Sequence, residues 1–150
     1  MEPVIFHVVP ASSRMFWVIL PVGGVLILVI ALFVFIAHTA RNTTAEVSDK
    51  GLRINGGMYG RFIPKESLVK EDIKVLNLNE DSAHRTTWRT NGVGLPGYSA
   101  GWFRLRNKEK ALVYLTDRTR VVYIPTKEGY AVMLSLTQPE EMVKAAREVW

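Results

Sequence analysis

The residues from Met15 to Ala37 form a run of 23 without a charged side chain, and no other feature limits the possible folds as strongly. As a helix, such a run rises about 35 Å, which is enough to cross a hydrocarbon core of about 30 Å. Arg14 precedes the run and Arg41 follows it closely, while Trp17 lies at its N-terminal boundary, where aromatic rings favour the membrane interface. We therefore predict a transmembrane helix over residues 15–37, with the lipid bilayer around it.

Two other interpretations of this run are a buried core helix and a cleaved signal peptide. A 150-residue soluble protein offers too little interior to enclose so long an apolar helix. The run also exceeds the apolar part of a signal peptide, which has about 7–15 residues, and Ala37–Ala40 is a poor cleavage site. We favour an uncleaved single-span anchor in a cell membrane, with the signal peptide as the alternative.

The charges on either side of the run bear on its orientation. Arg14 is the only Lys or Arg before it, whereas Arg41, Lys50 and Arg53 follow it. Cytoplasmic flanks carry the excess of positive charge, so this count favours a cytoplasmic position for residues 38–150. The orientation stays open, because Arg14 directly adjoins the membrane and could hold the N-terminus inside.

Turn signals divide the rest of the chain into short strands. We expect four segments in all: an N-terminal segment 1–14, the transmembrane helix 15–37, a linker 38–45 and one folded domain 46–150. Within the domain, Asp49–Gly51 and Asn55–Gly57 are turn signals between short apolar runs. The domain is thus expected to be mainly β, with room for a single core.

The second half of the domain shows a clearer pattern. Its apolar runs are separated by turns of about three residues, which predicts an antiparallel meander of four strands. These strands cover residues 101–106, 111–116, 121–126 and 130–136. A final helix is predicted after Thr137, which with Glu140 forms a capping box. Its expected apolar face consists of Met142, Ala145, Ala146 and Val149.

Residues suited to catalysis are sparse. The chain has no cysteine, which excludes disulfides, thiolate chemistry and iron–sulfur clusters, and its three histidines share no metal-ligand spacing. Gly92–Gly97 has the letters G-x-G-x-x-G, but a strand rather than a helix is expected after it, so it lacks the context of a dinucleotide site. We expect no enzyme activity, no cofactor and no metal, and we interpret Gly92–Gly97 as a glycine loop that enters a strand.

Positive charge is the remaining functional signal. Residues 85–120 carry eight basic side chains and two acidic ones. The candidate residues for binding a lipid or a partner are Arg89, Asn91, Arg104, Arg106, Arg118 and Arg120. A domain tethered beside anionic lipid gains about 1 kcal/mol for each such cation near the surface. The turns at 106–110 and 117–120 lie at opposite ends of one strand pair, however, so ordinary solvated charges are the alternative. We expect no binding of nucleic acid, since no base-stacking motif is present.

Several of these segments resemble the bacterial pleckstrin-homology-like (PH-like) domain family, including members anchored in membranes. The resemblance extends over roughly residues 45–149. The segments that carry it are Gly51–Pro64, Thr90–Leu105, Ala111–Asp117, Val121–Thr126 and Leu134–Glu141. It implies a PH-like barrel of two antiparallel sheets capped by one C-terminal helix. Eukaryotic relatives hold phosphoinositides with basic residues of the first hairpin; Lys50 and Arg53 match that pattern, but Asn55 replaces its last Arg.

The family implies a binding or scaffold module rather than an enzyme. Gly23 and Gly24 allow another helix to approach closely in the membrane. We therefore expect an accessory or interaction subunit of a membrane protein complex, or a homo-oligomer. The alternative is a module that binds anionic lipid headgroups through its basic residues. Residues 91–97 are either a structural turn or, with Arg89, a small anion-binding or peptide-binding edge.

Overall fold

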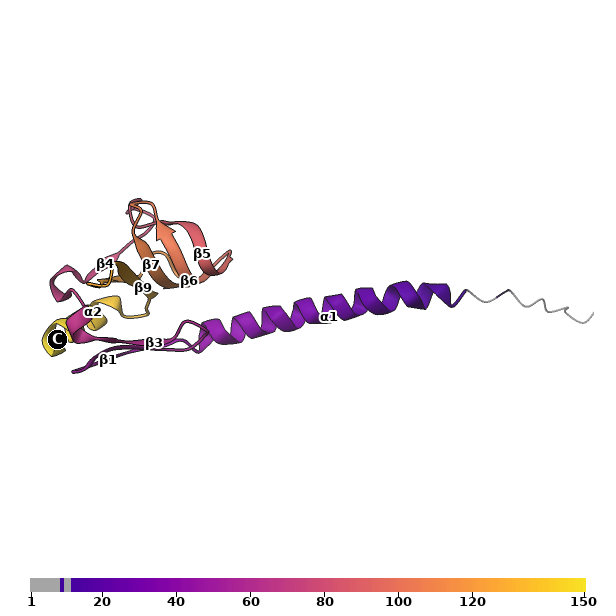
Figure 1. Ribbon diagram of the computed structural model, residues 1–150, viewed down its shortest axis with the longest axis horizontal. Coiled ribbons are helices and arrows are strands. Elements are labelled where there is room, and N and C mark those ends of the chain that lie inside the picture. The colour runs from indigo at the N-terminus through magenta and orange to yellow at the C-terminus, as the bar shows by residue number, and fades with distance from the viewer. Residues whose placement is uncertain (1–8, 10–11) are drawn as a thin grey trace, which may run out of the picture. The chain divides into compact units, whose positions relative to one another are not determined.

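The structure is a computed structural model that describes residue 9 and residues 12–150. Most of the predicted N-terminal segment 1–14, namely residues 1–8, 10 and 11, lies outside the described residues. The chain separates into two compact units, with the boundary between His38 and Thr39. The first unit is dominated by helix α1, Arg14–Arg41, and the second contains all the strands (Figure 1).

Helix α1 is apolar around its whole circumference. It has 28 residues, none of them buried, and its most apolar window has a mean hydropathy of 3.1. It is long and apolar enough to cross a membrane, by length and composition. Strand β1 begins at Thr44, so only Asn42 and Thr43 of the predicted linker 38–45 lie between α1 and the first strand.

The second unit is built from nine strands, two short 3-10 helices and one α-helix. In chain order they are β1 Thr44–Ser48, β2 Gly51–Asn55, β3 Arg61–Pro64, η1 Lys65–Ser67, η2 Lys70–Asp72, β4 Lys74–Leu76, β5 Thr86–Leu95, β6 Tyr98–Leu105, β7 Lys110–Leu115, β8 Val121–Pro125, β9 Tyr130–Ser135 and α2 Pro139–Val149. They form a three-stranded sheet, β1-β2-β3, and a six-stranded sheet, β4-β8-β9-β7-β6-β5. The predicted fold class is confirmed: the domain is mainly β, with two sheets and a C-terminal helix.

One pairing in the six-stranded sheet differs from the predicted meander. Strand β7 does not pair with β8; it pairs in parallel with β9, which in turn pairs antiparallel with β8. Strand β8 still runs antiparallel to β7, but the connection leaves one strand position between them, which β9 fills. The backbone of that connection accepts hydrogen bonds from both sides, from Leu78 N–H at Arg118 O and from Leu136 N–H at Arg120 O. Turn signals reveal where a strand ends but not which neighbour it joins, so this prediction was wrong.

The structure of residues 91–97 also differs from the glycine loop that the sequence predicts. Residues 91–95 continue strand β5, and the turn to β6 consists of only Pro96 and Gly97, where Gly97 has φ 77°. The strand has two bulges, at Thr87 and Thr90, whose hydroxyls donate to the β6 carbonyls of Arg104 and Trp102 at 2.9 and 3.0 Å. The alternation of apolar and polar residues did not identify β5 as a strand, because its side chains are mostly polar and exposed, as expected for a strand at the edge of a sheet.

Two hydrophobic cores hold the domain together. The first lies between the two sheets and α2, with Leu52, Ile63, Leu112 and Val132 among its fully enclosed members. The second lies against the other face of the six-stranded sheet. Its members are Leu76, Leu78, Phe103, Leu105, Ala111, Val113, Leu115, Val121, Tyr123, Ala131 and Met133. The central strands β7, β8 and β9 are therefore buried on both faces.

Helix α2 packs against β1, β4 and β8, between the two sheets (Figure 1). It begins after Gln138, which makes no side-chain cap, and Pro139 occupies its first turn. The predicted capping box at Thr137 was therefore wrong. The buried residues are Pro139, Val143 and Ala146, whereas Val149 remains 41% exposed. Val143, Ala146 and Trp150 are spaced i, i+3, i+7 and contact the same core, so the buried face of α2 is centred on Val143 and leaves Val149 at its margin.

Candidate functional site

The six candidate residues do not form one surface. Arg106 lies in the β6–β7 turn, next to Lys110 at the start of β7, while Arg118 and Arg120 follow the opposite end of β7 at Leu115. Charges at the two ends of the same strand pair cannot contact one flat ligand together. The expectation that these turns are separated thus holds in the fold.

The three candidates within the β5–β6 hairpin also divide between its two faces. Arg89 is opposite Phe103, which belongs to the second core, whereas Asn91 is opposite Trp102, which packs against the first. Arg104 is two residues from Trp102 and shares its face, because successive side chains of a strand alternate. Asn91 accepts a hydrogen bond from the Tyr59 hydroxyl at 3.0 Å, which links the two sheets.

Two of the candidate arginines are already engaged within the domain. The Arg104 guanidinium donates to Lys108 O at 2.8 Å. Arg120 lies 4.0 Å from the Asp117 carboxylate. Hydrogen bonds from the Thr119 side chain and backbone, with a smaller contribution from Arg120, lower the pKa of Asp117. Both guanidiniums therefore stabilise turns, so their charge alone does not identify a binding site.

A different group of side chains comes together around the indole of Trp102. The Lys110 ammonium lies 4.4 Å from the ring centroid and the Arg61 guanidinium carbon lies 4.8 Å from it. Tyr130 completes the group with an edge-to-face contact at 5.1 Å, and Arg61 also lies 6.0 Å from the Tyr130 ring. We call Arg61, Trp102, Lys110 and Tyr130 the Trp102 cluster.

Strand register brings the Trp102 cluster together from three separate parts of the chain. Trp102 lies within β6, and Lys110 is the first residue of β7. Lys110 is paired with Arg104 of β6 on one side and with Tyr130 of β9 on the other. Arg61 is the first residue of β3 in the smaller sheet, so its contact with Trp102 connects the two sheets. The cluster is thus fixed by strands rather than by loops.

The two cations of the Trp102 cluster have no acidic partner among the described residues. Among the described residues, the ion pairs are His84–Asp81, Arg120–Asp117 and Lys144–Glu148, so no carboxylate neutralises Arg61 or Lys110. The Nε atom of Arg61 is buried and has no hydrogen-bond partner. Cation–π attraction to Trp102 offsets part of the cost of confining these cations, by about 0.5–2 kcal/mol each.

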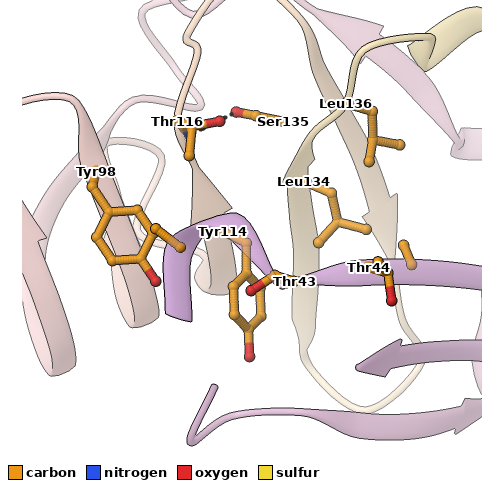
Figure 2. A pocket seen from close by; sticks show the side chains of 10 residues that line it. Thr43, Thr44, Tyr98, Tyr114, Thr116, Leu134, Ser135 and Leu136 are labelled. Atoms are coloured by element: carbon orange, nitrogen blue, oxygen red, sulfur yellow. Dashed lines mark hydrogen bonds between the residues drawn. The ribbon is translucent and has the colours of Figure 1, made fainter. Parts of the chain in front are cut away.

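A small pocket opens near the start of β1, beside Tyr114 (Figure 2). It has a volume of about 60 Å³ and is lined mainly by hydroxyl-bearing and small apolar side chains. Burial, together with the neighbouring Tyr98, raises the pKa of Tyr114 to about 12. The Ser135 hydroxyl in its wall already accepts from the Thr116 and Asp117 N–H groups, both at 3.1 Å. A pocket of this size has room for a few waters and not for a cofactor.

The polar network around Tyr123 is structural in character. Its hydroxyl donates to both Glu109 carboxylate oxygens at 2.9 Å, and burial together with Glu109 raises its pKa. His84 packs on the Tyr123 ring and makes a 2.8 Å hydrogen bond with Asp81. Burial acts to raise the pKa of Asp81, but the hydrogen bonds of His84 outweigh it and lower that pKa. Within the described part of the chain, no three acidic or histidine side chains are grouped as metal ligands.

Sequence reasoning missed most of the Trp102 cluster. From the sequence, the alternation of side chains along residues 101–106 predicts that Trp102 and Arg104 share a face, and Lys110 is one of the eight basic residues of segment 85–120. Arg61 comes from a segment 41 positions earlier and reaches Trp102 only because the two sheets pack together. Its one available signal was a basic residue at the start of an apolar run, which is too common to identify a site.

Comparison with known proteins gives one finding about family. A family model described as "Bacterial PH domain" matches residues 43–149, which includes every strand and all of α2. No curated protein and no solved structure matches the chain.

Proposed function

The chain belongs to the family of bacterial PH domains, and from this premise we propose that it is a single-span membrane protein whose PH-like domain binds a membrane protein partner. PH-like domains are in general non-catalytic binding or scaffold modules. The proposed role is accordingly that of an accessory or scaffold subunit, with residues 15–37 in the bilayer and residues 38–150 on the cytoplasmic side.

The observation that carries this proposal is the exposure of α1. None of its 28 residues is buried, although its most apolar window has a mean hydropathy of 3.1. A helix of this length rises about 42 Å, more than a bilayer core of about 30 Å requires. The exposed apolar surface needs cover from lipid or from other helices, since water would not solvate it favourably. With Gly23 and Gly24, where an added Cβ would meet nothing within 4 Å, α1 can also accept a neighbouring helix.

A partner protein is favoured over a general anionic surface by the placement of the charges. The candidate arginines lie at both ends and on both faces of the large sheet, so they cannot all face one membrane plane. In contrast, Trp88 of edge strand β5 is 72% exposed and is paired with Arg104. Exposed tryptophan beside arginine is the composition of energetic hot spots in protein interfaces. This supports β5 as the partner-facing edge of the domain.

A pull-down of the tagged full-length chain in mild detergent tests the subunit role. We expect a membrane protein to be recovered in stoichiometric amount with the wild type. Trp88→Ala should lower that recovery about tenfold, because the anchor side chain of an interface is lost. Val149→Ala is the matched control, since Val149 is a 41% exposed apolar residue of α2, which packs against β1, β4 and β8, and it should recover the partner like the wild type.

Recovery of the wild-type chain alone would contradict the subunit role. The alternative, binding to an anionic lipid surface, would then predict salt-sensitive retention of the domain by anionic vesicles. Equal recovery with Trp88→Ala and the wild type would show that the partner binds elsewhere than at β5.

A further inference from the structure

The Trp102 cluster holds two cations, Arg61 and Lys110, that form no ion pair with a carboxylate of the described residues. We propose that it is a binding site for the phosphate group of an anionic ligand, with Arg61 and Lys110 as the binding side chains. The site lies on β3, β6, β7 and β9 and includes none of the residues of the first hairpin. The proposal does not depend on the membrane partner, because it concerns a different part of the domain.

The register of β6 and β7 shows that this arrangement is unfavourable without a ligand. Lys110 lies directly opposite Arg104, and like charges in that position destabilise a strand pair. Arg104 turns its guanidinium to Lys108 O, and Lys110 turns to the Trp102 ring. Arg61 then brings another cation to the same ring from the other sheet. A bound dianion would relieve this repulsion between cations.

Arg61 is positioned by ring contacts and not by hydrogen bonds. Its buried Nε has no partner, and no described side chain or carbonyl accepts from the rest of its guanidinium. The residue is half-buried, so its terminal nitrogens are the part left accessible. A planar guanidinium with free terminal donors matches two phosphate oxygens, and a nearby ammonium adds a point charge.

The rigidity of the site strengthens the argument. Arg61, Trp102 and Lys110 all start from strands, and the Trp102 ring holds both cations within 5 Å of its centre. Two long, normally mobile side chains are thereby ordered before any ligand arrives. Binding then requires little further loss of side-chain freedom, which is the condition under which charged contacts yield net affinity.

The test uses the ¹⁵N-labelled full-length chain in nanodiscs of neutral phosphatidylcholine, titrated with glycerol phosphate. The indole N–H resonance of Trp102 reports on the site, and Trp102→Phe assigns it. We expect a saturable shift for the wild type, with affinity about tenfold weaker in Arg61→Gln and in Lys110→Gln. Lys110 is exposed, so its variant should retain the wild-type melting temperature and keep the test valid if Arg61→Gln unfolds.

Arg53→Gln is the matched control. Arg53 also stacks on an aromatic ring, 5.4 Å from the centroid of Phe62, and its loss removes the same charge. It should leave the affinity for glycerol phosphate within about twofold of the wild type, because Arg53 is exposed on the face of the smaller sheet opposite to Arg61, where solvent screens its charge. An equal loss of affinity in Arg53→Gln, or a wild-type resonance that does not shift, would overturn the proposal.

A second arm identifies the source of the phosphate. In nanodiscs that contain phosphatidylglycerol, a lipid headgroup that occupies the site would weaken the apparent affinity for glycerol phosphate, and Lys110→Gln would abolish this competition. Unchanged affinity in those discs, together with a saturable wild-type shift, would assign the site to a soluble phosphate compound. Competition that persists in Lys110→Gln and Arg61→Gln would contradict the proposed site.

Discussion

Gly101→Ala should lower the free energy of unfolding of the domain by at least about 2 kcal/mol. Gly101 has φ 113°, a region that residues with a side chain rarely adopt. A Cβ at this position would lie 2.5 Å from Asn91 O and 2.6 Å from Gly92 Cα, both on the backbone of β5. Neither atom can move without opening the β5–β6 pair. Urea denaturation of the full-length chain in mild detergent, followed by near-UV circular dichroism, measures the loss.

Gly94→Ala is the control for this prediction and should change the free energy of unfolding by less than about 0.5 kcal/mol. The nearest atom to a new Cβ there is Phe103 Cζ at 3.6 Å, an ordinary contact, and Gly94 is not among the glycines with positive φ. A glycine loop over Gly92–Gly97 with a positive φ at Gly94 would instead make this substitution destabilising by about 1 kcal/mol or more. A larger loss from Gly94→Ala than from Gly101→Ala would contradict the register of β5 with β6.

Two charges in the middle of α1 should remove the protein from the membrane. Ile27 and Ile30 lie near the centre of the apolar helix and are 70% and 54% exposed. Arginine at the centre of a spanning helix costs about 2.5–3.5 kcal/mol per residue on insertion scales. We therefore expect the Ile27→Arg/Ile30→Arg double variant to leave the carbonate-resistant membrane fraction, in which the wild type remains.

The Ile27→Ala/Ile30→Ala double variant controls for the loss of the isoleucine side chains. Alanine keeps the helix uncharged, so this variant should stay in the membrane fraction. If the arginine variant also stays there in the wild-type amount, α1 is not the membrane anchor.

Local features of the fold could be predicted from the sequence, because they depend on neighbouring residues. The hairpin of β1 and β2 around Asp49 and Lys50 follows from its turn residues, and the apolar helix follows from an uncharged run. The parallel pairing of β7 with β9 could not be predicted in this way. It depends on which strand fills the space beside β7, and the buried strands β7, β8 and β9 carry similar apolar side chains.

The candidate site likewise combines features that neighbouring residues determine with contacts between distant parts of the chain. Counting charges along the chain identified the basic segment 85–120, yet within turns a hydrogen bond engages Arg104 and an ion pair engages Arg120. The Trp102 cluster forms because Arg61 crosses from the smaller sheet, and cross-sheet contacts have no fixed spacing in sequence. What the sequence did indicate was the shared face of Trp102 and Arg104, which follows from the alternation of a strand.

The central claim, a single uncleaved span with a cytoplasmic binding domain, is tested most directly by labelling with a membrane-impermeant maleimide. The chain has no cysteine, so each introduced cysteine is a unique target. Val9→Cys, before α1, should be labelled in intact spheroplasts, and Lys127→Cys, exposed in the β8–β9 turn, only after the membrane is permeabilised. Labelling of Lys127→Cys in intact spheroplasts, or loss of the Val9→Cys label from the mature chain, would contradict the account.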